Sequence, residues 1–138
     1  MVENYTIKDA IYLVSGEDAL DLHNNYDFTE ITYSVAERRA TLTWTRSSGD
    51  WVPPSEPLQL QLEFHGVSCF RFMPRDPEMP FTEDNCLSSA GYWTDEDWCE
   101  GVMIFEGDPG PRWLRAFHFQ SGATVAIAAD EAKAIIRR

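Results

Sequence analysis

The residues that could do chemistry are concentrated in one acidic and aromatic segment, GYWTDEDWCEG at 91–101. It places three aromatic rings among four carboxylates, namely Tyr92, Trp93 and Trp98 beside Asp95, Glu96, Asp97 and Glu100. Aromatic rings supply desolvated contact area at interfaces, and carboxylates steer and orient lysine and arginine. With Glu83 and Asp84 shortly before it, the segment is a candidate binding site for a basic protein. The alternative is that Trp93 and Trp98 are core residues with solvated acids between them.

The charge distribution also favours a cationic partner. The chain has 23 acidic and 11 basic residues, which gives a net charge of −12. Ten of the acids lie between Asp76 and Asp108, and that span has no lysine, arginine or histidine. This charge opposes binding to nucleic acid or to anionic membranes, because both require clustered lysine and arginine.

The three histidines offer a second set of reactive side chains. His23 lies near Asp18 and Asp21, a spacing that would allow acid–base work. The alternative function is therefore a small enzyme or a ligand-binding β domain, with a pocket near His23, His65 or His118. The simpler interpretation of His23 is a loop histidine that bonds to nearby backbone.

Other reactive patterns are missing from the sequence. The cysteines Cys69, Cys86 and Cys99 have no C-x-x-C spacing, so a zinc site would need long-range convergence. There is no G-x-S-x-G motif and no glycine-rich phosphate loop. We therefore expect no catalytic residue, no metal ion and no cofactor.

Strands must position these residues. Alternating runs at 28–35 and 40–46 predict a β-hairpin, with Ala40, Leu42 and Trp44 on one face. In PLQLQLEFHGVSCFRF at 57–72, apolar and polar residues alternate up to Phe64. After Phe64, apolar residues occupy both faces. We interpret this segment as one long strand, bent at Gly66, that continues into a two-sheet interior or beneath a covering loop.

The remaining segments are divided by turn signals. Strands are expected at 5–14, 101–107, 112–119 and 123–129, and the last three of these form a meander. Long loops are expected at 16–27, 47–57 and 73–91. The tail at 130–138 fits either a short helix or a strand, and we favour the strand.

About seven strands with few helical signals predict an all-β fold, either an antiparallel β-sandwich or a barrel-like sheet. The 138 residues are expected to form a single domain, 1–138. The odd number of cysteines, without regular spacing, indicates a reducing compartment. With no secretory signal and no apolar run of about 18 residues, a cytoplasmic location is expected. The sequence gives no signal for oligomeric state.

The order of these patterns resembles a known family. A short leading strand precedes ALDLHNN and a threonine-rich hairpin, and an aromatic strand runs into SGATVAIAA near the end. Between them stands an LxLxFxGV strand formed by Leu60, Leu62, Phe64, Gly66 and Val67. The whole resembles the small acidic all-β immunity proteins of bacterial polymorphic toxin systems, in particular the group known as immunity protein 50.

That resemblance implies a non-enzymatic binder that masks a toxin domain, and it identifies neither the toxin nor the binding residues. In that group a His-Asp pair commonly follows the first strand, whereas this chain has His23-Asn24. We therefore expect a protein-binding module whose acidic surface covers a basic toxin domain by steric and electrostatic blockade.

Overall fold

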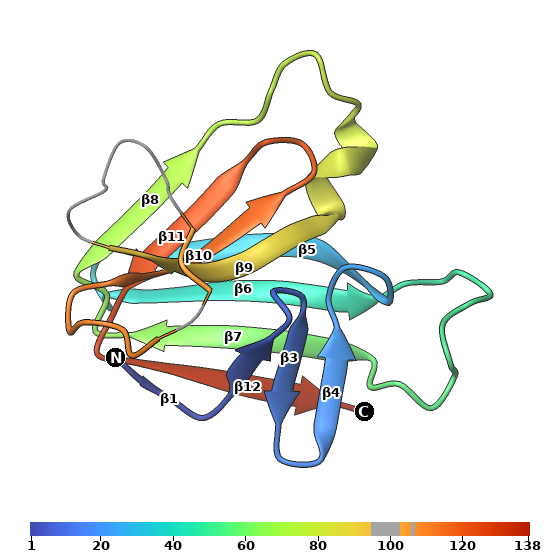
Figure 1. Cartoon of the computed structure of the whole chain (residues 1–138), viewed down its shortest axis with the longest axis horizontal. Helices are drawn as coiled ribbons and strands as arrows, with labels where there is room; N and C mark the ends of the chain where they lie inside the picture. The colour runs from blue at the N-terminus through green and yellow to red at the C-terminus, as the bar shows by residue number, and fades with distance from the viewer. Residues whose placement is uncertain (95–102, 106) are drawn as a thin grey trace.

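The protein is an all-β domain, as its sequence predicts (Figure 1). The computed structural model describes residues 1–94, 103–105 and 107–138. These residues form twelve strands in three sheets and a single 3₁₀ turn. The sheets are open, so the sandwich expectation fits them better than the barrel.

The largest sheet contains the predicted hairpin. Its strands, in spatial order, are β1 (Val2–Glu3), β12 (Glu131–Arg137), β7 (Gln59–His65), β6 (Arg39–Arg46) and β5 (Tyr26–Ser34). The tail is a strand, as favoured, and it lies between β7, its antiparallel neighbour, and β1, which runs parallel to it. Ala40, Leu42 and Trp44 of β6 are buried, which confirms the inward face predicted for that strand.

The second sheet has the order β8 (Cys69–Met73), β11 (Thr124–Ala128), β10 (Leu114–Phe119) and β9 (Leu87–Trp93). The predicted meander exists, but its first strand is β9, and 101–107 lies partly outside the described residues. The long loop predicted at 73–91 is therefore too long, because 87–91 belongs to β9. Within it stands the 3₁₀ turn η1 (Phe81–Asn85).

The third sheet is small and corrects two predictions. It consists of β2 (Thr6–Lys8), β3 (Tyr12–Ser15) and β4 (Asp18–Asp21). The single strand predicted at 5–14 is a hairpin, because the chain reverses at Asp9 and Ala10, both with positive φ. The loop predicted at 16–27 contains β4, which buries Leu20 against the core.

Aromatic rings from both large sheets meet in the core. The Phe28 ring centroid lies 4.9 Å from that of Trp44 and 4.5 Å from that of Phe119. Trp44 also packs against Phe117, at 5.4 Å. The two sheets therefore share one hydrophobic core, which is what a sandwich arrangement requires.

Gly66 marks the point where the chain passes from one large sheet to the other. The prediction of one long bent strand is wrong, because β7 and β8 belong to different sheets. Gly66 has φ of +69°, and a Cβ at that position would lie 2.1 Å from Oδ2 of Asp130. Arg38 Nε donates to the Val67 carbonyl at 3.1 Å and fixes the crossing. The change in apolar parity after Phe64 reflects this change of sheet.

Replacing Gly66 by alanine should lower the free energy of unfolding by about 1–3 kcal/mol, measured by urea denaturation. The left-handed backbone disfavours an L-residue by about 1–2 kcal/mol, and the methyl group meets the Asp130 carboxylate. Adding Asp130→Ala should recover the part of the loss that comes from this contact. Wild-type stability in Gly66→Ala would contradict the described crossing.

Candidate functional site

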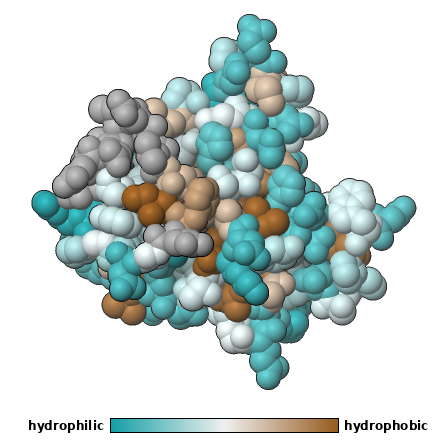
Figure 2. Space-filling view, in the orientation of Figure 1, coloured by the Kyte–Doolittle hydropathy of each residue, from teal (hydrophilic) through white to brown (hydrophobic). Residues whose placement is uncertain are grey.

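The segment 74–86, here called the acidic arm, projects from the body of the protein at the top right of Figure 1. It carries four carboxylates, those of Asp76, Glu78, Glu83 and Asp84. Phe81 stands among them with its side chain 81% exposed. Figure 2 shows mostly hydrophilic residues over this projection. The arm thus presents an aromatic ring in an acidic surround, the pattern expected of a site for a basic protein.

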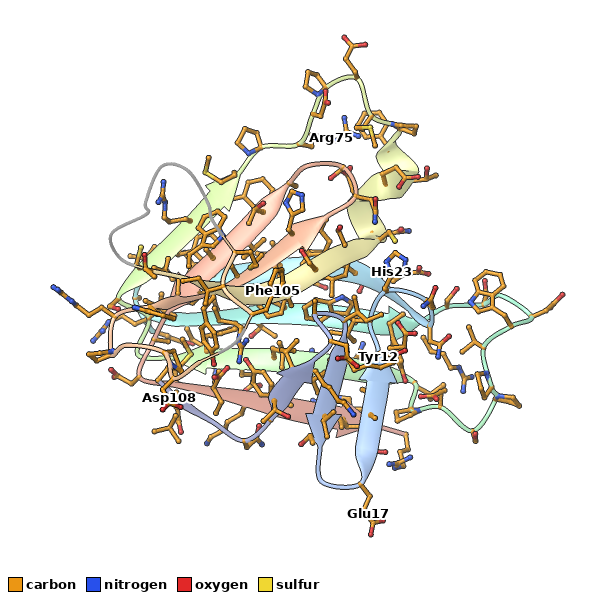
Figure 3. The ribbon with its side chains drawn as sticks, in the orientation of Figure 1. Tyr12, Glu17, His23, Arg75, Phe105 and Asp108 are labelled. Carbon is orange, nitrogen blue, oxygen red and sulfur yellow. The ribbon has the colours of Figure 1, made fainter. Side chains whose placement is uncertain are left out.

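Arg75 holds the arm in shape from within (Figure 3). Its Nε donates to Oδ1 of Asp84 at 2.9 Å, and its Nη2 donates to the Met79 carbonyl at 2.6 Å. Its guanidinium carbon lies 4.6 Å from the centroid of the Phe81 ring. The hydrogen bond from Arg75 holds the pKa of Asp84 below its usual range. Asp84 is therefore ionised at neutral pH, and the pair keeps the arm closed on itself.

Backbone hydrogen bonds fix both ends of the arm to the turn between β10 and β11. The Asp76 amide donates to the Ser121 carbonyl at 2.7 Å, and the Ser121 amide donates to the Glu83 carbonyl at 3.1 Å. The Gln120 amide donates to the Cys86 carbonyl at 2.9 Å. A segment held in this way loses little conformational entropy when a partner binds it.

The four predicted partner-binding residues that the structure describes fall into two separate pairs. Glu83 and Asp84 lie on the acidic arm, whereas Tyr92 and Trp93 lie at the far end of β9. The seven-residue strand between them spans roughly 20 Å, at about 3.3 Å per residue. The other five predicted residues, Asp95, Glu96, Asp97, Trp98 and Glu100, lie outside the described residues.

Trp93 is a core residue and not a surface anchor. Its side chain is only 5% exposed and packs with Leu114 and Ala116 in a small second cluster. Its buried indole nitrogen has no hydrogen-bond partner among the residues that the structure describes. Of the two interpretations of Trp93, the structure therefore supports the core one.

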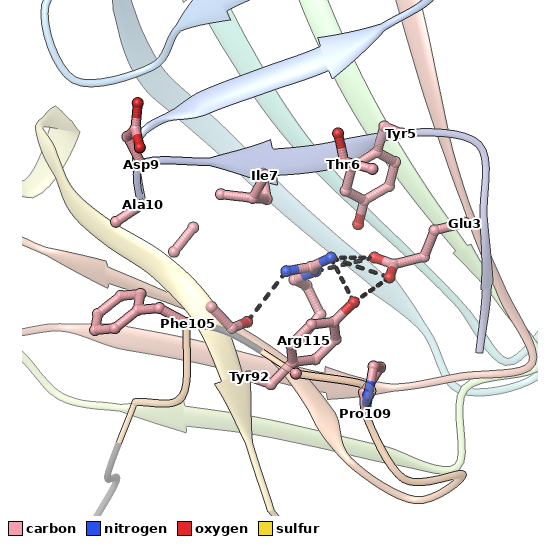
Figure 4. A pocket seen from close by; sticks show the side chains of 13 residues that line it. Glu3, Tyr5, Thr6, Ile7, Asp9, Ala10, Tyr92, Phe105, Pro109 and Arg115 are labelled. Atoms are coloured by element: carbon pink, nitrogen blue, oxygen red, sulfur yellow. Dashed lines mark hydrogen bonds and ion pairs between the residues drawn. The ribbon is translucent and has the colours of Figure 1, made fainter.

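Tyr92 belongs to a buried polar cluster at the bottom of a cavity of about 420 Å³ (Figure 4). At the centre is Arg115, which is 3% exposed. Its Nε and Nη2 donate to the two carboxylate oxygens of Glu3, at 2.9 and 3.0 Å. Nη2 also donates to the Tyr92 hydroxyl at 2.7 Å, and that hydroxyl donates to Glu3.

The two phenols at this cluster, Tyr92 and Tyr5, are neutral at neutral pH. Burial raises the pKa of Tyr92 to about 12, although Arg115 opposes the shift. Burial also raises the pKa of Tyr5, whose hydroxyl lies in the interior beside Glu3 and Arg115. Both phenols therefore stay protonated at neutral pH and cannot act as general bases there. The guanidinium and the carboxylate neutralise each other.

Cys86 and His23 lie together, as a catalytic dyad would, but their chemistry opposes that role. Cys86 Sγ is 3.6 Å from His23 Nδ1. The same nitrogen lies 2.6 Å from the Leu87 carbonyl and must carry a proton to donate to it. Burial, with Glu83 and Asp27, raises the pKa of the Cys86 thiol. The nitrogen cannot take the thiol proton, and Cys86 remains a weak nucleophile.

The other two histidines make local contacts. His65 lies 3.2 Å from a carboxylate oxygen of Glu63, and His118 lies 2.8 Å from the Thr124 hydroxyl. None of the three histidines lines the cavities described for this structure. The pocket expected near His23, His65 or His118 therefore stays a prediction.

Further observations concern metals, thiols and membranes. Within the described part of the chain, no three histidine, cysteine, aspartate or glutamate side chains are grouped as metal ligands would be. Cys69 and Cys86 are free thiols, and Cys99 lies outside the described residues. Over the same described residues, no helix has the length and apolar character needed to cross a membrane.

Sequence reasoning missed three notable residues. Phe81 and Trp51 stand in proline-rich segments without alternation, a context in which a large apolar side chain has no strand face to bury it. Trp51 is 66% exposed, and its indole nitrogen donates to the Asn24 carbonyl at 2.7 Å. Arg115 lies two residues before the buried Phe117 in β10 and therefore on the same face of the strand. This spacing is the sequence signal for an inward-facing charge.

Comparisons with known proteins found no match among family models, curated proteins or solved structures. No relative supplies an activity, a partner or a set of site residues. Function has to be inferred from the residues of this chain and their geometry.

The pair formed by Glu3 and Arg115 should be strongly coupled. Replacing Glu3 by leucine or Arg115 by methionine leaves a buried charge without its partner, so each should cost about 3–5 kcal/mol of unfolding free energy. The double variant should regain most of that loss, because an apolar pair removes both charges. Chemical denaturation of all four proteins measures the coupling, and additive losses would show that the two residues act independently.

Stability should fall at alkaline pH, in part through Tyr92. Its pKa is about 10 when unfolded and about 12 when folded, so the folded state binds more protons between these values. The contribution is present below pH 10 and is lost as pH rises toward 12. In Tyr92→Phe, the unfolding free energy should fall less steeply with pH from pH 10 upward. The difference in slope should correspond to less than one proton released on unfolding. An unchanged slope would mean that the phenol titrates normally.

Proposed function

We propose that this domain is a non-enzymatic binding module whose acidic arm contacts a cationic protein. The observation that carries the proposal is Phe81, an 81% exposed ring among four carboxylates on a braced and projecting segment. The exposed ring gives the arm an apolar surface that a partner can bury beside the carboxylates. At interfaces, an aromatic anchor surrounded by charge is a frequent source of binding energy and specificity.

The arrangement of charge within the chain supports the proposal. Among the described residues, the basic side chains that pair with carboxylates of the same chain include Arg39, Arg75, Arg115, Lys133 and Arg138. Arg38 and Arg46 donate to backbone carbonyls. Since acids outnumber bases by 23 to 11, these internal contacts leave an excess of carboxylates for a partner. Such a field attracts a cationic protein and accelerates its association.

The partner we propose is a basic toxin domain, and the module would be of the immunity type. The resemblance to acidic all-β immunity proteins supports this choice, as does the absence of a general base or activated thiol among the groups described above. The mechanism is occlusion: the arm guides the toxin by charge, and Phe81 with its surroundings covers part of its basic surface. We propose the cytoplasm as the location, since Cys69 and Cys86 are free thiols.

The proposal can be tested with two matched triple variants. Asp76→Asn, Glu78→Gln and Glu83→Gln together remove three charges from the acidic arm. Asp9→Asn, Glu17→Gln and Asp108→Asn remove three exposed charges elsewhere. A partner is first captured from native lysate at low salt, identified and purified. The arm variant should then slow association about 5- to 10-fold at low ionic strength and flatten its salt dependence, because the local steering field is weaker.

The control variant should change association much less, because it alters the net charge equally but leaves the arm intact. Rates measured by stopped-flow at several salt concentrations separate the two. If both variants behave alike, binding depends on net charge alone and the arm is not the contact. If the captured protein is not basic, the proposed electrostatic mechanism is wrong.

A further inference from the structure

A second cavity, here called the edge groove, lies at the base of the acidic arm. Its volume is about 390 Å³, within the range of known ligand pockets. Its lining combines the arm with β5 and β8 and consists of Phe28, Thr29, Glu30, Ile31, Phe72, Pro74, Arg75, Asp84, Phe119 and Ala123. Apolar side chains predominate in this lining.

The groove reaches the aromatic core. At its floor Phe28 stacks on Phe119, with centroids 4.5 Å apart and planes at 29°. At its wall, Phe72 of β8 is 56% exposed. Tyr33 and Phe70 stack across the two strands at 4.7 Å, so the side chains of β5 and β8 already touch farther along. An apolar group entering the groove would contact rings on its floor and on its wall.

The strand edges indicate what kind of group could enter. Both β5 and β8 are the last strands of their sheets in the described part of the chain. The register of β5 shifts between Phe28 and Glu30, which is a bulge at the mouth of the groove. The Thr29 hydroxyl there lies 3.3 Å from the Thr43 carbonyl. Bulges prevent an edge from pairing with an added strand. The geometry therefore favours a single inserted side chain over an added strand.

Charge around the mouth indicates the neighbours of that side chain. Glu30 and Asp84, which is paired with Arg75, line the groove, and its lining residues Pro74 and Arg75 begin the arm that carries Asp76 and Glu78. Lysine or arginine next to the inserted group would meet these carboxylates, whereas acidic neighbours would be repelled. An apolar centre with a charged rim is the usual anatomy of a protein interface.

We propose that the edge groove receives an apolar side chain of the cationic partner, flanked in that partner by lysine or arginine. This inference rests on the proposed function, because it takes the acidic arm as the rim of the same interface. Phe81 and the carboxylates guide and hold the basic residues, and Phe72, Phe28 and Phe119 hold the apolar one.

A matched pair of variants tests the groove. Phe72→Ala removes the wall of the groove. Phe105→Ala is the control, because Phe105 lines the 420 Å³ cavity beside Arg115 and is 54% exposed, against 56% for Phe72. Phe72→Ala should weaken the affinity for the purified partner at least tenfold, mostly through faster dissociation of the complex. The melting temperature of the variant should change little. Phe105→Ala should bind as wild type. Equal affinities for Phe72→Ala and wild type overturn the proposal.

The result can be separated from that for the acidic arm. If the arm variant slows association while Phe72→Ala binds normally, the groove proposal fails and the proposed function stands. If no basic partner exists, both fail. A benzoylphenylalanine photocrosslinker at position 72 should couple to an apolar partner residue next to lysine or arginine. Coupling to an acidic or uncharged partner segment would contradict the proposal.

A free small molecule is the competing occupant. The neutral fluorescent probe N-phenyl-1-naphthylamine is titrated into wild type, Phe72→Ala and the complex with the partner. The proposal allows two outcomes. Either the partner displaces the probe bound in the groove, or the probe does not bind there. Probe binding that is lost in Phe72→Ala but unaffected by the partner would show a ligand site instead, and would overturn the proposal.

Discussion

One buried guanidinium joins the three sheets of this protein. Arg115 extends from β10 of the second sheet to Glu3 of β1 in the first sheet. Its guanidinium carbon lies 5.5 Å from the ring centroid of Tyr5, which leads into β2 of the third sheet. Removing two charges from water is costly, and only complete hydrogen bonding offsets that cost. The bidentate contact and the Tyr92 hydroxyl supply those bonds. The relative placement of the sheets therefore depends on a contact between residues 112 positions apart.

Arginine performs a similar task at the surface, where Arg75 links the two ends of the acidic arm through Asp84 and the Met79 carbonyl. The two sites differ in what they leave free. Around Arg115 the charges cancel and the phenols stay neutral, which suits a structural junction. Around Arg75 one carboxylate is neutralised and three others remain, which leaves a shaped anionic surface. The molecule thus separates a rigid, charge-balanced interior from a braced projection that can make contacts.

Local pattern predicted the elements that satisfy local rules. β7 alternates cleanly because Leu60, Leu62 and Phe64 face the shared core, and β6 places Ala40, Leu42 and Trp44 on the same core. Sequence reasoning failed where long-range geometry decides. From the sequence, Gly66 is predicted to bend one long strand, and only the assignment of β7 and β8 to different sheets shows that it marks a crossing. β4 resembles a polar loop until Leu20 is seen to be buried. The alternation of residue types could not show that Trp93 faces a core and that Phe81 faces water.

The position of β12 between β1 and β7 has a consequence for biosynthesis. Residues 131–137 must leave the ribosome before β1 has any neighbour in its sheet, and parallel pairing between such distant segments is slow. Until then the nascent chain presents the long edge of β7, with its alternating leucines, to other chains. The interval before β12 arrives is when the chain is most exposed to aggregation and most in need of chaperones.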